Sequence, residues 1–223
     1  MRKVVGDSDD LMLIDLVCFG APSLKAWLKY VKWKEMSAGK KLASINPRDK
    51  LFGWGRKTYY RYEWEDGTSD IKLSLFDPYA QLFYSTLGFR KCCFSCKFRG
   101  VERETDMTIC DCWGIETMGL KLDKGTIHNG VSGILVHSDK GLSLLNKLNV
   151  EKFECPLDEL VKNNKPMLHS PEMPVRWQEF NRDIETLQFS ELVDKWHLKV
   201  SRVAYLRSMA KRVIAGLLRK LGI

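Results

Sequence analysis

Five of the seven cysteines in this 223-residue chain fall within 21 residues, and this cluster constrains the fold more than any other feature. The clustered residues are Cys92, Cys93, Cys96, Cys110 and Cys112. The N-terminal residues contain no long apolar run followed by small residues, so we expect no signal peptide and a cytoplasmic location. Clustered thiols in a reducing compartment are more often metal ligands than disulfide partners. The sequence therefore predicts a chain that folds around a metal or redox centre.

The spacing of the clustered cysteines leaves three interpretations open. A C-x2-C pair at Cys93 and Cys96 is followed, after 13 residues, by a C-x-C pair at Cys110 and Cys112. A hairpin could close these pairs into a four-thiolate zinc site, and an iron–sulfur cluster would use the same thiolates. Free cysteine is also among the most buried residue types, so the third interpretation is that some of the five belong to the core.

Apolar alternation and turn residues predict strands and helices that mix without a regular βαβ repeat. We expect strands at residues 11–18, 41–46, 106–111, 130–137 and 151–155, and a β-hairpin at 59–75 turned by Asp66 and Gly67. We expect helices at residues 24–36, 78–87, 139–148, 156–163 and 174–187. This order predicts an α+β fold with a mixed sheet, flanking helices, the hairpin, a cysteine-rich loop and a C-terminal basic amphipathic helix.

Cys18 is a candidate functional residue although it lies far from the cluster in sequence. It ends the predicted strand at 11–18, and Ser23 is suited to cap the helix that begins at residue 24. The Cys18 thiol is thus expected near a helix N-terminus, where exposed N–H groups favour thiolates and other anions. The four histidines lie at no metal-ligand spacing from one another or from a cysteine, so we expect surface or internally satisfied residues.

The net charge of +8 comes entirely from the C-terminal tail. Residues 195–223 hold eight Lys and Arg residues and no Asp or Glu, and without them the 36 basic residues fall to 28, equal to the 28 acidic ones. A nucleic-acid-binding domain usually carries its basic residues across a folded face, so we expect no nucleic-acid partner. These observations predict a body at residues 1–187 and a basic helical tail at 188–223.

The tail has an apolar stripe on one predicted helical face from residue 201 onward. The stripe consists of Val203, Leu206, Ala210, Val213, Leu217 and Leu221. A cationic amphipathic helix of this kind can lie on an anionic membrane surface, which predicts peripheral membrane contact through residues 201–223. The alternative is that the stripe packs on the body of the protein and leaves its charges in water.

Four ordered segments of the chain resemble motifs of the coenzyme F420 hydrogenase/dehydrogenase β-subunit family. They are DLVCFGAPS at 15–23, INPRDKLFGW at 45–54, FRKCCFSCKF at 89–98 and DMTICDCWGIE at 106–116. The later segments GILVHSDKGLSLL and PVRWQEF extend the resemblance, which runs from about residue 13 to 183. The resemblance implies an oxidoreductase subunit that transfers electrons or hydride between a redox partner protein or second subunit and a flavin- or deazaflavin-type cofactor. Relatives also occur in bacterial polysaccharide-related gene sets, so the family does not fix the substrate.

The resemblance also implies the ligands of an iron–sulfur cluster, of the 4Fe-4S type. The family's cysteine positions fall on Cys18, Cys93 and Cys96. Cys110 and Cys112 stand where the family more often has a glycine and an aromatic residue, which favours the Cys18 set over the zinc set. Family members carry a longer N-terminal region with further cysteines, so the resemblance implies a short member of the family. The fourth thiolate would then come from Cys92, Cys110, Cys112 or a second chain.

Two groups of residues are candidates to bind FAD or a related flavin. The first group, on a predicted loop, is Arg48, Asp49 and Lys50. One interpretation is that these residues bind the phosphates of the flavin, and the other is that they form only a solvated turn with an Arg–Asp pair. The second group is Asp111, Trp113 and Gly114. Trp113 is expected either to stack on the flavin ring or to belong to the core. Asp111 is expected either to bind a cofactor or only to cap a turn. The alternative function is a non-catalytic interaction module stabilised by zinc on Cys93, Cys96, Cys110 and Cys112.

Overall fold

The chain passes back and forth between two units before either of them is complete. The structure is a computed structural model that describes residues 6, 8, 10–55, 57–203 and 205–207. Unit 1 comprises the described residues of Met1–Ala21, Gly53–Gly55 and Arg90–Glu172. Unit 2 comprises the described residues of Pro22–Phe52, Arg56–Phe89 and Met173–Ile223. The predicted boundary between residues 187 and 188 stays a prediction.

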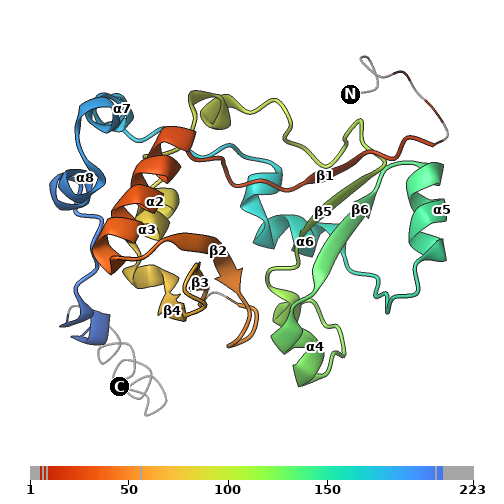
Figure 1. Cartoon of the computed structure of the whole chain (residues 1–223). Helices are drawn as coiled ribbons and strands as arrows, with labels where there is room; N and C mark the ends of the chain where they lie inside the picture. The colour runs from red at the N-terminus through yellow and green to blue at the C-terminus, as the bar shows by residue number, and fades with distance from the viewer. Residues whose placement is uncertain (1–5, 7, 9, 56, 204, 208–223) are drawn as a thin grey trace, which may run out of the picture. The chain divides into compact units, whose positions relative to one another are not determined.

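Unit 1 contains a three-stranded sheet in the order β1-β5-β6 (Figure 1). Its strands are β1 (Ile14–Leu16), β5 (Met107–Asp111) and β6 (Ser132–Val136). Strand β1 runs parallel to β5, whereas β6 runs antiparallel to β5. The parallel and antiparallel pairings confirm the predicted mixed sheet, and the helices that follow complete the predicted α+β class.

Helices and short 3₁₀ turns complete unit 1. The helices are α4 (Lys124–Asn129), α5 (Asp139–Lys147) and α6 (Leu157–Asn163), and the turns are η2 (Lys91–Ser95), η3 (Ile115–Thr117) and η4 (Lys165–Met167). Asp123 and Ser138 cap α4 and α5, because their side-chain oxygens accept backbone N–H groups of the first turn. The buried core of this unit consists of Cys110, Cys112, Ile115, Met118, Leu160 and Met167.

Unit 2 is built on an antiparallel sheet in the order β2-β3-β4. The strands are β2 (Leu42–Asp49), β3 (Tyr59–Trp64) and β4 (Ser69–Leu73). The last two form the predicted hairpin, and Gly67 in its turn has a φ of 80°, which glycine adopts without strain. The hairpin prediction is therefore confirmed.

Four helices and one 3₁₀ turn accompany the sheet of unit 2. They are α2 (Leu24–Ala38), η1 (Ser74–Phe76), α3 (Pro78–Tyr84), α7 (Trp177–Thr186) and α8 (Phe189–Lys195). Ser23 is the N-cap residue of α2 as predicted, although its side chain makes no capping hydrogen bond. Helix α2 ends at Gly39, whose left-handed conformation directs its N–H to carbonyls of the last turn.

A buried carboxylate lies at the centre of unit 2. Asp77 is 1% exposed and accepts the hydroxyl groups of Tyr30 at 2.9 Å and Tyr62 at 2.6 Å. Its other oxygen accepts the backbone N–H of Tyr79 at 2.9 Å and so caps α3. Burial, followed by the charge of Asp77, raises the pKa of both tyrosines far above the ordinary value of 10.0, so both hydroxyls are donors at neutral pH.

Two local predictions are wrong. Residues 47–49, expected in a loop, belong to β2, which reaches Asp49 through an irregular register with β3. Residues 151–155, expected as a strand, form no strand. Three of these five residues are charged and Phe153 is 40% exposed, so pairing this segment would bury little apolar surface.

Within the described part of the chain, no helix is long and apolar enough to cross a membrane. The predicted amphipathic helix at 201–223 lies mostly outside the described residues, which end at 207. Its described part has helical backbone at residues 202, 203 and 205–207. Contact with a membrane surface through this segment stays a prediction.

Candidate functional site

The cysteine-rich segment binds the turn that leaves β1, which we call the exit turn (residues 18–21). Cys93, in η2, is 9% exposed, and its sulfur accepts the backbone N–H of Ala21 at 3.3 Å. The Ala21 carbonyl in turn accepts the N–H of Arg90 at 3.0 Å. The structure thus brings two of the motif segments together within unit 1, although about 70 residues separate them in sequence.

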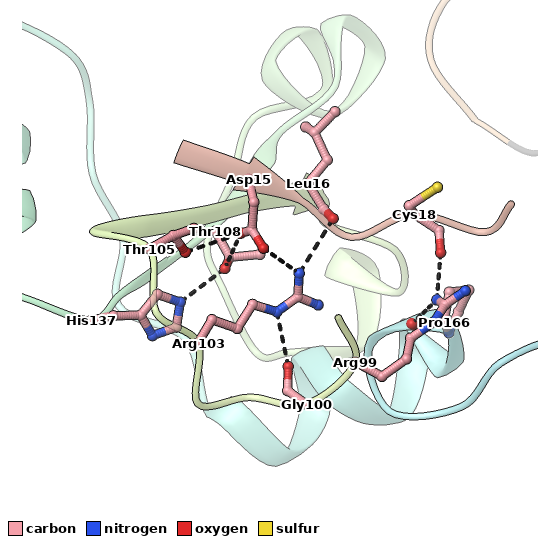
Figure 2. Close-up of polar contacts among 10 residues, drawn as sticks. All are labelled: Asp15, Leu16, Cys18, Arg99, Gly100, Arg103, Thr105, Thr108, His137 and Pro166. Carbon is pink, nitrogen blue, oxygen red and sulfur yellow. Dashed lines mark hydrogen bonds and ion pairs between the residues drawn. The ribbon is translucent and has the colours of Figure 1, made fainter. Parts of the chain in front are cut away.

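Arg99 also binds this turn (Figure 2). Its guanidinium group donates to the carbonyl oxygens of Cys18, Phe19 and Pro166, the second at 3.3 Å. Its Nε atom is buried and has no hydrogen-bond partner among the described residues. Arg99 therefore fixes the backbone of the exit turn by donating to two of its carbonyls and ties it to Pro166, and the Cys18 side chain above it is exposed.

A polar network lies beside the exit turn, around the Asp15 side chain of β1 (Figure 2). Asp15, in the middle of β1, accepts Arg103 Nη1 at 2.6 Å and the Thr108 hydroxyl at 2.5 Å. Arg103 also donates to the carbonyl oxygens of Gly100 at 3.0 Å and Leu16 at 3.4 Å. Its side chain is 7% exposed, so this ion pair is largely removed from water. Nothing in the sequence around Asp15 predicts this role, because its partners are 88 and 93 residues away.

The network fixes the proton position on His137. The Thr108 hydroxyl has one hydrogen, which it donates to Asp15, so its oxygen is left to accept from His137 Nε2 at 2.8 Å. His137 therefore carries a proton on Nε2 whether the ring is neutral or charged. For His137, this agrees with the expectation that each histidine is a surface or internally satisfied residue.

The predicted cluster ligands lie in one unit but do not form a ligand set. Cys18 is exposed, Cys93 is buried and Cys96 is half-buried, with the Cys96 N–H donating to Ser170 Oγ at 3.1 Å. Among the described residues, no three His, Cys, Asp or Glu side chains gather closely enough to hold a metal ion. The assignment of Cys18, Cys93 and Cys96 as ligands of an iron–sulfur cluster stays a prediction.

The other two cysteines of the zinc hypothesis belong to the core of unit 1. Cys110 and Cys112 are 9% and 3% exposed, and burial raises the pKa of their thiols to about 12 and about 11. Cys110 lies opposite Gly133 in the sheet, where a Cβ atom would come within 2.7 Å of its sulfur. Glycine at this position leaves room for the thiol. Both cysteines therefore pack as small apolar residues in this structure.

Alkylation rates should separate the two classes of cysteine. At pH about 8, we expect N-ethylmaleimide to modify Cys18 and Cys92, which are exposed, at least about a hundredfold faster than Cys110 and Cys112. The physical reason is that a buried thiol with a raised pKa offers little thiolate and little access. Peptide-resolved mass spectrometry measures the rates, and the same protein in urea is the control. Equal rates in the native protein would contradict the core assignment.

A pair of stacked tryptophans joins two of the motif segments at the end of β5. The rings of Trp54 and Trp113 lie 4.7 Å apart, centre to centre, with planes 22° from parallel. The Trp54 indole N–H donates to Asp111 Oδ1 at 3.3 Å. Both tryptophans are half-buried, so the pair keeps part of its surface in contact with solvent. We call Trp54, Trp113 and Asp111 the tryptophan site. The sequence predicts Asp111 and Trp113 as candidate residues but does not predict Trp54.

Three glycines let other side chains approach the tryptophan site. A Cβ atom on Gly130 would lie 2.6 Å from the Trp54 ring, and one on Gly53 would lie 2.5 Å from the His128 ring. A Cβ on Gly114, whose φ is 78°, would lie 2.4 Å from the Asn163 side chain. These glycines therefore permit the close packing that positions the two rings.

The second predicted flavin group lies in the other unit. Arg48, Asp49 and Lys50 belong to unit 2, whereas the tryptophan site belongs to unit 1. Asp49 is 8% exposed and accepts the Arg61 guanidinium at 2.6 Å, and this hydrogen bond lowers the pKa of the carboxyl group. An Arg–Asp pair is present as one interpretation expected, and its arginine is Arg61. A role of Arg48, Asp49 and Lys50 in flavin binding stays a prediction.

Comparison with known proteins adds one finding. Residues 3–156 match the family model that describes the C terminus of the coenzyme F420 hydrogenase/dehydrogenase beta subunit. The matched region contains the exit turn, the cysteine-rich segment and the tryptophan site. No curated protein and no solved structure matches the chain.

Proposed function

This chain belongs to the family defined by the C-terminal region of the coenzyme F420 hydrogenase/dehydrogenase β-subunit, and from this membership we propose an electron-transfer role with a flavin or deazaflavin. The family relates it to the redox subunits of these enzymes. In the proposed role, the chain passes electrons or hydride between a redox partner, either a separate protein or a second subunit, and a bound cofactor such as FAD. We place this reaction in the cytoplasm.

The observation that carries the proposal is the half-buried tryptophan pair. Stacked, half-buried aromatic rings suit a planar tricyclic ring system, because offset stacking adds favourable energy to the burial of both surfaces. Asp111 orients the Trp54 ring by accepting its indole N–H, and Gly114 allows the chain to turn immediately after Trp113. When bound, the cofactor would supply the hydride or electron chemistry, and the protein would supply its position and surroundings.

The proposal does not route electrons through a cluster on Cys18, Cys93 and Cys96. The three thiols are not gathered as ligands in the described residues, and two of the cysteines that might replace a missing ligand are buried in the core. The contacts around the exit turn favour a structural contribution from the cysteine-rich segment. Arg99 and Cys93 fix the exit turn and leave the exposed Cys18 at its surface.

Flavin titration tests the proposed function. We expect the protein to quench FMN or FAD fluorescence in a saturable way, and Trp113→Leu to weaken the affinity about tenfold through the loss of stacking. Trp33→Leu is the matched control, because Trp33 is a half-buried tryptophan of unit 2 and should leave the affinity unchanged. Absence of saturable binding, or equal affinities for the Trp113 variant and the wild type, would reject the tryptophan site as the cofactor platform.

A further inference from the structure

Unit 2 contains a pocket of about 320 Å³ that is separate from the residues discussed so far. Its lining residues come from β4, from η1 and from the chain that follows α8. Six of the residues that line the pocket are Ile71, Leu73, Phe76, Lys72, Lys199 and Arg202. Three of them are apolar and three are cationic, and no carboxylate is among its described lining residues. The volume falls within the range of roughly 300–1,000 Å³ that small-molecule sites occupy.

The cations of the pocket are only partly neutralised by their surroundings. Lys199 Nζ lies 3.1 Å from Asp194, but the two side chains are 64% and 72% exposed, so water screens this pair. Arg202 lies over the Phe76 ring, 5.9 Å from its centre, which leaves the guanidinium hydrogens for other acceptors. Neither the aromatic ring nor the exposed ion pair supplies a buried counter-charge.

A fourth cation, Lys34, interacts with Lys72. Lys34 is 8% exposed, and its ammonium group lies 3.6 Å from the centre of the Tyr62 ring. Burial, and next the charge of Lys72, lower the pKa of Lys34 to about 8, while the charges of Asp77 and Asp70 act in the opposite direction. Two lysine ammonium groups are therefore close enough to destabilise each other. An anion beside Lys72 would relieve that repulsion.

We propose that this pocket binds a small phosphate ester, with its phosphate among Lys72, Lys199 and Arg202 and its organic part against Phe76. A phosphate dianion suits a pocket lined by three cations better than a single carboxylate does, and a guanidinium can bind two phosphate oxygens at once. The apolar lining of Ile71, Leu73 and Phe76 suits a planar or hydrophobic group attached to that phosphate. The proposal is independent of the cofactor role proposed for the tryptophan site, because all its residues belong to unit 2.

Calorimetric titration with adenosine 5′-monophosphate (AMP), adenosine and inorganic phosphate tests the inference. We expect AMP to bind the full chain more tightly than either fragment, because it alone engages both the cations and Phe76. Adenosine binding as tightly as AMP would overturn the role of the cations, and phosphate binding as tightly as AMP would overturn the role of Phe76. No saturable AMP binding at about 5 mM would overturn the site as a whole.

Charge-removing variants assign the binding to this pocket. We expect Lys72→Gln combined with Arg202→Gln to weaken AMP binding at least about tenfold, because two charge-assisted contacts are lost. Both residues are exposed, so the fold should be retained, which the thermal unfolding curve checks. Lys32→Gln removes an exposed charge from α2 outside the pocket and should leave AMP binding within about twofold of wild type. An equal loss in both variants would show unspecific charge attraction and overturn the proposal.

Discussion

Replacing Asp77 with alanine is expected to destabilise unit 2 by about 3 kcal/mol. The N-cap of α3 is lost, which contributes about 1 kcal/mol. Tyr30 and Tyr62 lose their shared acceptor, but their hydroxyl groups lie 2.9 Å apart and can still bond to each other. One buried hydroxyl hydrogen is thus left without a partner, which costs roughly 1–3 kcal/mol.

Urea unfolding followed by segment-resolved hydrogen exchange measures this effect within the full chain. The exchange readout is needed because two units need not unfold in one step. Asp77→Asn keeps an oxygen that can cap α3, so we expect it to be less destabilising than Asp77→Ala. Glu65→Ala, an exposed carboxylate in the same unit, should change stability by no more than about 0.5 kcal/mol. If Asp77→Ala is as stable as Glu65→Ala, the buried carboxylate does not organise this core.

The Asp15–Arg103 pair is expected to produce the second large effect, in unit 1. Asp15→Ala leaves a guanidinium that is 7% exposed with carbonyl partners only, and we expect a loss of about 3 kcal/mol. The value lies at the low end for a buried pair because the Asp15 side chain is 28% exposed. Since Asp15 also accepts the Thr108 hydroxyl, the substitution removes a contact between β1 and β5.

A double-mutant cycle distinguishes the ion pair from simple packing. We expect Asp15→Ala combined with Arg103→Met to be less destabilising than the sum of the two single substitutions, because no unpaired charge remains. Free energies of unfolding from urea titration give the coupling, and alkylation of Cys93, which is buried against Ala21, reports whether the exit turn has been released. Strictly additive effects would show that the two side chains do not act as a pair.

Elements with a local signal were predicted well from the sequence. The hairpin of β3 and β4 follows from alternating aromatic and aliphatic residues around Asp66 and Gly67, and these residues are adjacent in sequence. Strands β5 and β6 and helices α5 and α6 have a similar local origin. The segment at 151–155 shows the limit, because a weak alternation forms a strand only when a partner strand and a buried face are available.

The candidate site was predicted less completely because its contacts are not local. The partners of Asp15 are 88 and 93 residues away, so its role appears only after β1 has paired with β5. Trp54 is close in sequence to Arg48, but residues 53–55 belong to unit 1 and residue 48 to unit 2. The two cysteines of the C-x-C pair have ligand-like spacing, and only the position of Gly133 opposite Cys110 shows that this thiol points into the core.

The interleaved order of the two units has a consequence for the growing chain on the ribosome. Strand β1 is made 93 residues before its parallel partner, as the pairing of Ile14 with Met107 shows. At roughly 5–20 residues per second, β1 waits on the order of 5–20 s before β5 emerges. Ile14 and Leu16 are without a strand partner during this time, and unit 2 also needs residues made after residue 172. Synthesis that pauses or stops at residue 52 or 89 therefore leaves neither unit complete, and a stop at residue 172 leaves unit 2 incomplete. Such products are expected substrates for chaperones and proteases.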